Sequence, residues 1–253
     1  MLIESIKHLI KMIKVVAAQI KITNNTLENL DNIIRYIKKA SSKKVDIICF
    51  PETSLFYNRN RKALKKIQFN NHLKKIKESC KENKIHCIFG SNTLKNNKLC
   101  NSAFFIDDKG KMIYTYDKVN LFRAEKGKVI SGKTNKIIKT KFGKIGIIIC
   151  WDISYPEFVK KLSKQGAWII FCPSYIKNYG RELESYLDIP YVRAFENLCY
   201  FVSCDSANKE CAQYSVICSP SKIIDKIKGK EGLIVAELDR RKIVGLRKRY
   251  RLV

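Results

Sequence analysis

From residue 13 onward the chain alternates short apolar segments with amphipathic ones, and no other feature constrains the fold as strongly. Residues 13–20 (IKVVAAQI) are typical of a buried strand, and residues 26–44 follow with the apolar spacing of a helix. We predict Thr26 as the N-cap of this helix, because its hydroxyl can accept a hydrogen bond from the first free backbone N–H groups. The alternation favours a layered α/β domain in which helices cover sheets.

The remaining predicted elements continue this alternation. Further strands are predicted at residues 45–50, 85–92, 145–150, 167–174, 198–204, 214–220 and 232–238, and further helices at 62–83, 156–166 and around 191–197. Pro156 suits the first turn of its helix, where no backbone N–H is required. Residues 100–118 are predicted to form a hairpin whose turn lies at Asp108, Lys109 and Gly110.

A length of 253 residues suits one large domain, which we place at 13–253, preceded by an N-terminal extension at 1–12. The extension is interrupted by charged residues and lacks a small-residue cleavage site, so we interpret it as a short helix and not as a signal peptide. No apolar run approaches the roughly 20 residues that span a bilayer, and we expect no membrane partner.

The net charge of +27 raises the question of a polyanion partner. Lysine is spread along the whole chain, which favours solvated faces over a binding site; only the tail at 239–253 concentrates arginine. We expect no nucleic-acid partner. A catalytically silent protein that binds polyanions remains the alternative from another class, and its binding would weaken steeply with added salt.

Ten cysteines would suggest disulfides in a secreted protein, but the chain has no convincing export signal and no CxxC pair with the spacing of a zinc site. Reduced thiols in a cytoplasmic protein are the simplest interpretation. A redox or metal role for the cysteine-rich segment 199–218 is a weaker alternative.

Three polar residues follow apolar strands, where a layered α/β fold gathers its functional groups. They are Glu52 in IICFPETSLF, Lys118 in YTYDKVNLF and Cys150 in IGIIICWDISYPE. In the last segment the apolar run breaks abruptly after the cysteine, which indicates a thiol at the mouth of a strand. Each residue alone has an ordinary structural explanation, but the three together, in this order, indicate a catalytic site.

With these motifs and RAFEN at 193–197, the chain resembles the nitrilase superfamily of carbon–nitrogen hydrolases, in its amidase-like branch. The resemblance runs from the first strand to the last. It implies a four-layer α-β-β-α sandwich that forms a homodimer or a higher homo-oligomer and that uses no metal and no organic cofactor.

The resemblance also implies a role for each catalytic residue. Cys150 would be the nucleophile, Glu52 the general base and later the acid, and Lys118 the group that stabilises the oxyanion beside the backbone N–H of Trp151. Glu125 lies where the family usually places a second glutamate. A carboxylate base suits this chain, because its histidines at 8, 72 and 86 are poorly placed to activate the thiol.

Other matches to the family concern the pocket and its supports. Trp151 and Tyr155 are candidate pocket walls, and Ser174 and Tyr175 resemble the loop that lines the acyl pocket. Polar residues expected to tie a helix to the site or to brace the turn after the nucleophile are Arg193, Glu196, Asn197, Asp152 and Glu157.

The expected reaction is the hydrolysis of a small linear amide to acid and ammonia through a cysteine thioester. An N-carbamoyl-amine hydrolase and a nitrilase are the alternatives within the superfamily. Two departures from the family pattern leave the substrate open: Asn120 stands where histidine is frequent, and Ser154 stands where many members carry arginine.

Overall fold

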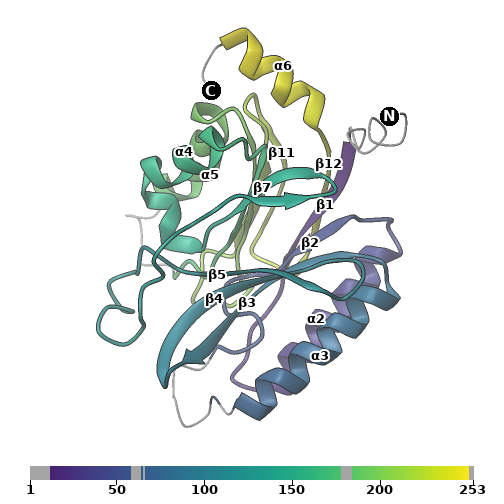
Figure 1. Cartoon of the computed structure of the whole chain (residues 1–253), viewed down its shortest axis with the longest axis vertical. Coiled ribbons are helices and arrows are strands. Elements are labelled where there is room, and N and C mark those ends of the chain that lie inside the picture. Colours follow the sequence, from purple (N-terminus) through teal and green to yellow (C-terminus); the bar gives the residue numbers. More distant parts are fainter. Residues whose placement is uncertain (1–11, 58–63, 65, 178–183, 251–253) are drawn as a thin grey trace.

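The computed structural model describes residues 12–57, 64, 66–177 and 184–250, which build two six-stranded sheets packed face to face (Figure 1). The first sheet has the strand order β12-β1-β2-β3-β4-β5 and consists of β1 (Met12–Gln19), β2 (Ile47–Cys49), β3 (His86–Lys95), β4 (Lys98–Ile106), β5 (Met112–Asp117) and β12 (Gly232–Asp239). The second has the order β11-β10-β9-β8-β7-β6 and consists of β6 (Ile138–Thr140), β7 (Gly143–Ile147), β8 (Ile169–Pro173), β9 (Tyr200–Cys204), β10 (Tyr214–Cys218) and β11 (Ile223–Lys228).

Helices cover the outer face of each sheet. In Figure 1, α2 (Thr26–Ser41) and α3 (Lys66–Glu82) lie against the first sheet, whereas α4 (Pro156–Lys164) and α5 (Glu184–Glu196) lie against the second. The final helix, α6 (Arg240–Tyr250), extends beyond the end of β12. The layers therefore run helix, sheet, sheet, helix, and the predicted four-layer α-β-β-α sandwich is confirmed.

The period of two along a strand explains how one segment serves two cores. In β1, Val15 and Ala17 point into the core between the sheets, while Val16 and Ala18 pack against the helical layer. A strand that is buried on both faces has no polar face, which is why residues 15–18 form a continuous apolar run.

Three strands that lead into the site, β2, β7 and β8, run parallel to neighbouring strands, whereas β5 is the antiparallel edge strand of the first sheet. β1 pairs with β2 and β2 with β3 in the first sheet; β7 pairs with β8 and β8 with β9 in the second. The carboxyl ends of parallel strands meet at one edge, so the loops after β2, β7 and β8 gather there.

Most predicted elements match the structure, and the start of α4 at Pro156 and the hairpin turn after residue 107 are confirmed. The predicted cap at Thr26 is wrong. The side chain of Asn25 caps α2, accepting hydrogen bonds from the N–H groups of Leu27 and Glu28 at 3.0 and 3.4 Å, and Thr26 is the first helical residue. β6, β11 and α6 were not predicted. The predicted extension at 1–12 lies outside the described residues apart from Met12, the first residue of β1.

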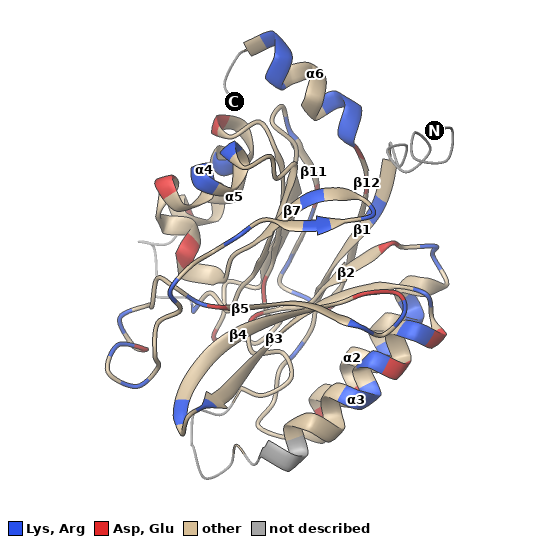
Figure 2. Ribbon diagram, in the orientation of Figure 1, with Lys and Arg blue, Asp and Glu red and all other residues tan. Residues whose placement is uncertain are grey.

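The charge is spread over the fold. Figure 2 shows Lys and Arg on helices of both outer layers, on α6 and on hairpin turns. Within α6, Arg247 turns inward and donates hydrogen bonds to the carbonyl oxygens of Ala167 at 2.6 Å and Leu198 at 2.9 Å, which ties the helix to the ends of α4 and α5. Across the described ranges, no helix is long and apolar enough to cross a membrane.

All ten cysteines are free and buried. Those of the segment 199–218 contribute small side chains to the cores: Cys199 and Cys218 lie between the second sheet and its helices, and Cys204 lies between the sheets. Among the residues that the structure describes, no three His, Cys, Asp or Glu side chains form a group that could hold a metal ion.

Candidate active site

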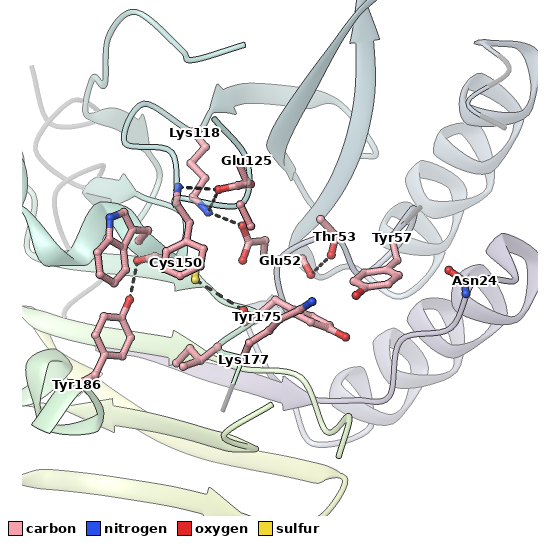
Figure 3. Close-up of a pocket in the computed structure, with 14 residues that line it drawn as sticks. Asn24, Glu52, Thr53, Tyr57, Lys118, Glu125, Cys150, Tyr175, Lys177 and Tyr186 are labelled. Atoms are coloured by element: carbon pink, nitrogen blue, oxygen red, sulfur yellow. Dashed lines mark hydrogen bonds and ion pairs between the residues drawn. The ribbon is translucent and has the colours of Figure 1, made fainter. Parts of the chain in front are cut away.

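A cavity of about 410 Å³ opens where the loops after β2, β5, β7 and β8 meet (Figure 3). It is lined by Asn24, Glu52, Thr53, Tyr57, Lys118, Phe122, Ala124, Glu125, Cys150, Trp151, Tyr175, Ile176, Lys177 and Tyr186. The predicted catalytic residues Glu52, Lys118, Glu125 and Cys150 all reach it, although up to 98 positions separate them in the sequence.

Glu52 is held by a tightly fitted loop after β2. Its backbone N–H donates to the carbonyl oxygen of Ser174 at 3.2 Å, and the hydroxyl of Thr53 donates to the Glu52 carbonyl oxygen at 2.7 Å. Thr53 itself has a φ of +56°, a conformation that a β-branched residue adopts only where its surroundings enforce it. The loop also lies directly on Gly90, where a Cβ atom would meet the Thr53 nitrogen at 2.4 Å.

Lys118 follows β5 and carries a buried ammonium between two carboxylates. Its Nζ lies 2.8 Å from Oε1 of Glu52 and 2.7 Å from Oε2 of Glu125, and its side chain is 2% exposed. Burial alone would lower the pKa of Lys118, but the carboxylates of Glu52 and Glu125 outweigh it and raise the pKa above its usual value. The ammonium therefore stays charged.

Asn101, which the sequence analysis missed, joins the two carboxylates. Its Nδ2 donates to Oε1 of Glu52 at 2.6 Å and to Oε1 of Glu125 at 2.8 Å, and its backbone carbonyl accepts from the N–H of Lys118 at 2.9 Å. Burial would raise the pKa of Glu125, but Lys118, Asn101 and the backbone N–H of Phe122 lower it. Glu125 is accordingly ionised at neutral pH.

Cys150 begins a short 3-10 helix, Cys150–Ser154, three residues after the end of β7. Its φ is +43°, and its thiol donates to the carbonyl oxygen of Tyr175 at 3.9 Å. Burial raises the pKa of Cys150 well above the ordinary value and the charge of Glu52 raises it further, while Lys118 opposes both. The thiol is thus protonated at rest.

Asp152 braces the turn after Cys150, as predicted. One carboxylate oxygen accepts from the N–H of Ile149 at 2.9 Å and from the hydroxyl of Tyr116 at 2.7 Å; the other accepts from the N–H of Asn120 at 2.7 Å and its Nδ2 at 3.0 Å. Asn120, which stands where the resemblance predicts a histidine, thus bonds to this buried carboxylate through its backbone N–H and its side-chain amide. Glu157 lies exposed in the first turn of α4, near the positive end of that helix.

The polar residues of α5 contact the same turn. Nε of Arg193 donates to the carbonyl oxygen of Ile153 at 2.9 Å, and its Nη1 lies 2.9 Å from Oε1 of Glu196. Nδ2 of Asn197 donates to the same Glu196 oxygen at 3.1 Å. These contacts link α5 to the 3-10 helix that begins at Cys150.

Aromatic side chains form most of the cavity wall. The predicted wall residues Trp151 and Tyr175 line it, but Tyr155 and Ser174 do not. Tyr155 precedes α4 and its side chain is 36% exposed, because the 3-10 helix turns it away from the cavity. Ser174 is buried with its hydroxyl donating to the carbonyl oxygen of Cys172 at 3.1 Å, so only its backbone reaches Glu52.

Phe122, Tyr57 and Tyr186 complete the wall and were not predicted. Phe122 contacts Trp151 edge-on at 5.0 Å between ring centroids, and Tyr186 stacks on the same indole at 5.8 Å. Tyr57 packs on Tyr175 at 5.0 Å. Their only sequence signal is that each is an aromatic residue close to a helix or loop that borders the site.

No histidine of the described residues lines the cavity. His86 lies buried in β3 against Phe142, and burial lowers its pKa. His72 lies in α3, and His8 lies outside the described residues. A thiol, a carboxylate and a charged amine around one cavity can perform nucleophilic attack, proton transfer and oxyanion stabilisation without an imidazole.

Known proteins resemble this chain in sequence and in fold. The carbon-nitrogen hydrolase family model matches residues 14–248. The probable hydrolase nit2 of Schizosaccharomyces pombe is 30% identical over 253 residues, covering 88% of this chain and 90% of that protein. The 2-oxoglutaramate amidase of Bacillus subtilis is 26% identical and covers 84% and 85%.

Solved structures agree with the architecture. A carbon-nitrogen hydrolase from Helicobacter pylori superposes with a TM-score of 0.87 at 18% identity, covering 96% of this chain and 94% of that one. An amidase from Nesterenkonia sp. gives 0.83 at 17% identity, covering 94% and 96%. Because the family model matches nearly the whole length of this chain, the chain belongs to the carbon–nitrogen hydrolases of the nitrilase superfamily.

Proposed function

We propose that this chain hydrolyses a small linear amide to the free acid and ammonia through a thioester on Cys150. The observation that carries the proposal is the cavity at which the thiol of Cys150, the carboxylate of Glu52 and the ammonium of Lys118 meet. Membership of the carbon–nitrogen hydrolases and the relative named as an amidase support the amide as substrate class.

The first half of the reaction makes the thioester. Because the raised pKa keeps the Cys150 thiol protonated, attack requires a base, and Glu52 accepts the proton as the sulfur bonds to the amide carbon. The carbonyl electron pair moves onto oxygen, where Nζ of Lys118 and the backbone N–H of Trp151 stabilise it. Glu52 then protonates the amide nitrogen, the C–N bond breaks and ammonia leaves.

The second half consumes water. A water molecule attacks the thioester carbon while Glu52 accepts one of its protons, and the same two donors stabilise the new oxyanion. The C–S bond then breaks and the proton returns from Glu52 to the sulfur. Glu125 remains ionised throughout and holds Lys118 in place, so its role is to position the ammonium and balance its charge.

The acyl group would lie among the aromatic walls. Trp151 and Tyr175 border the cavity beside Cys150, with Tyr186 stacked behind the indole. A narrow apolar site of this kind suits a short aliphatic acyl chain.

The test is a panel of short amides, N-carbamoyl amines and nitriles, with released ammonia as the readout. Amides should give the highest kcat/KM, and Cys150→Ala should abolish release, while Cys80→Ala, on the buried face of α3, should leave it unchanged. Faster turnover of N-carbamoyl amines or nitriles contradicts the amide assignment. Turnover retained by Cys150→Ala contradicts the thioester.

We also propose that two copies associate through α5 and α6. Val192 and Phe195 lie three residues apart on α5 with 46% and 63% of their surface exposed, and Val244 on α6 is 56% exposed. Light scattering should give twice the chain mass of 29.3 kDa, and Phe195→Glu should reduce it to one chain. A wild-type protein that runs as a single chain contradicts the proposal.

A cytoplasmic location is proposed from the thiols. All ten cysteines are free in the fold, which suits a reducing compartment. Thiol titration in denaturant, on protein extracted without reductant, should find ten free thiols; a lower number contradicts this assignment.

A further inference from the structure

The peptide unit that joins Cys150 to Trp151 is held in an unusual conformation. Cys150 has a φ of +43°, a region that non-glycine residues occupy only where neighbouring contacts compensate for the strain. This peptide unit carries both the carbonyl of the nucleophile and the N–H group that the proposed reaction uses for the oxyanion. Whatever holds the carbonyl therefore matters for catalysis.

Tyr186 holds it from a different element. Its hydroxyl donates to the Cys150 carbonyl oxygen at 3.3 Å, from the first turn of α5 and 36 positions later in the chain (Figure 3). The thiol of Cys172, on β8, approaches the same oxygen at 3.9 Å as a weaker donor. The carbonyl thus faces α5 and β8.

The ring of Tyr186 contacts Trp151, the residue at the other end of this peptide unit. It stacks on the indole of Trp151 with ring centroids 5.8 Å apart and an angle of 10° between the planes. The indole is also fixed from its edge by Phe122. One side chain therefore contacts the carbonyl before this peptide bond and the side chain after it.

A peptide unit is planar, and in the trans form its C=O and N–H point in opposite directions. The described residues contain no cis peptide bond. Because the Cys150 carbonyl faces Tyr186 and Cys172, the N–H of Trp151 faces away from them. Rotation of the plane would require the Tyr186 hydrogen bond to break.

We propose that Tyr186 is a positioning residue that aims the backbone N–H of Trp151 at the developing oxyanion by holding the Cys150 carbonyl. The inference rests on the proposed amide hydrolysis for its catalytic part. Its structural part, the control of one N–H group by one hydroxyl, can be tested without any turnover.

The structural test uses the fact that the chain has two tryptophans, Trp151 and Trp168. Protein labelled with 15N-tryptophan gives two backbone amide signals, which a Trp168→Phe variant assigns. Tyr186→Phe keeps the ring and removes the hydroxyl, so it should shift the Trp151 amide signal and speed its hydrogen exchange while leaving the Trp168 signal unchanged. A Trp151 amide that does not respond overturns the proposal.

The matched control is Tyr191→Phe. Tyr191 lies on the same helix, and its hydroxyl also donates to a backbone carbonyl, that of Ser221 at 3.1 Å, but it does not line the cavity. Its removal should leave the Trp151 amide signal unchanged. A shift of equal size in this variant would mean that α5 as a whole responds, which overturns a specific role for Tyr186.

The catalytic test compares two reactions of the same sulfur. Amide hydrolysis develops an oxyanion, whereas alkylation by iodoacetamide forms an S–C bond, expels iodide and develops none. Tyr186→Phe should lower kcat about tenfold with little change in KM, less than the 10²–10³-fold cost of deleting an oxyanion donor outright. The alkylation rate should stay within about twofold of the wild type, because the thiol itself is undisturbed.

The outcomes separate the two proposals. If wild-type protein hydrolyses an amide and Tyr186→Phe hydrolyses it equally well, or if alkylation slows in step with hydrolysis, the positioning role is wrong and the proposed function stands. If the wild type hydrolyses no amide of the panel, the proposed function fails, and the tryptophan amide signals still decide the structural part.

Discussion

Lys118 carries a buried positive charge at the cavity, and two carboxylates and a thiol surround it. The arrangement is stable only if the carboxylates are held apart and directed at the ammonium, since a buried charge that loses its partner costs several kcal/mol. Asn101 holds them, as its single NH₂ group bonds to both.

Asn101→Ala should therefore lower kcat by about tenfold or more, because losing a hydrogen bond to a charged group costs about 1.5–3 kcal/mol. Its loss also raises the pKa of Glu125, since the Asn101 amide lowers it. The acid limb of the kcat profile should move to higher pH with KM unchanged. Asn83→Ala, in the turn after α3, serves as the control, and an unmoved acid limb would contradict the positioning role.

Glu52 should affect the thiol and the reaction in opposite directions. Its charge raises the pKa of Cys150, so Glu52→Gln should increase the thiolate fraction and speed alkylation by iodoacetamide at pH 8 severalfold. The same variant should lower amide hydrolysis by a factor on the order of 10²–10⁴, because the proton acceptor is gone. Equal slowing of both reactions would show that Glu52 activates the resting thiol instead; Glu78→Gln, on the surface of α3, is the control.

At the scale of elements, the loop after β2 depends on one missing side chain. A Cβ atom at Gly90 would lie 2.4 Å from the nitrogen of Thr53 and 2.8 Å from Cα of Glu52, and backbone atoms there cannot yield without moving the loop. The strand β3 thus sets the position of Glu52, the proposed general base, by direct contact.

Gly90→Ala should lower the free energy of unfolding by about 1–3 kcal/mol, the usual cost of overpacking, and should reduce kcat because Glu52 is displaced. The contrasting variant is Gly245→Ala in α6, where no atom lies within 4 Å of an added Cβ. That change should raise stability by about 0.5–1 kcal/mol, as a helical glycine is replaced. Urea unfolding and kcat measure both variants, and a Gly90→Ala protein as stable and active as the wild type would contradict the packing argument.

The sequence predicted those elements whose burial is periodic or continuous, and missed those that are mostly solvated. Residues 13–20 lie buried on both faces and read clearly as a strand. In α6 only Ile243 is fully buried, so its sequence is typical of a charged tail. The structure nevertheless attaches this helix to the fold through the hydrogen bond from Arg247 to the carbonyl oxygen of Ala167. The cap at Asn25 was misassigned by one position because Asn and Thr are both good N-caps.

The same limit applies to the site. Glu52, Lys118, Glu125 and Cys150 could be located because each stands in a recognisable local motif. Asn101 and Tyr186 could not, because their importance comes from contacts with residues 24 to 49 positions away, which no local pattern records.

At the scale of the whole molecule, Asp205 makes the stability of the fold depend on pH. It is fully buried and accepts hydrogen bonds from the N–H groups of Ile176 and Tyr214 at 2.9 and 3.2 Å. Burial raises its pKa to about 7. The native state therefore keeps a proton that the unfolded chain releases near pH 4, so this stabilisation is present below about pH 4 and is lost as the pH rises through about 7.

Between pH 5 and pH 8, the unfolding free energy of the wild type should thus fall further than that of Asp205→Asn. The expected difference is roughly 2–3 kcal/mol, because each pH unit below 7 contributes about 1.4 kcal/mol. Urea unfolding at the two pH values measures both proteins. The comparison of slopes cancels any constant cost of the substitution. Parallel slopes would mean that Asp205 does not titrate in this range.

The two sheets contribute different halves of the chemistry. Glu52, Asn101 and Lys118 belong to the first sheet and the loops that follow its strands, whereas Cys150 follows a strand of the second. Neither half alone makes an unusual environment: one would hold a salt bridge, the other an ordinary thiol. Because the proposed reaction needs groups from both sheets, a change that separates the two layers should abolish it even while each sheet keeps its own hydrogen bonds.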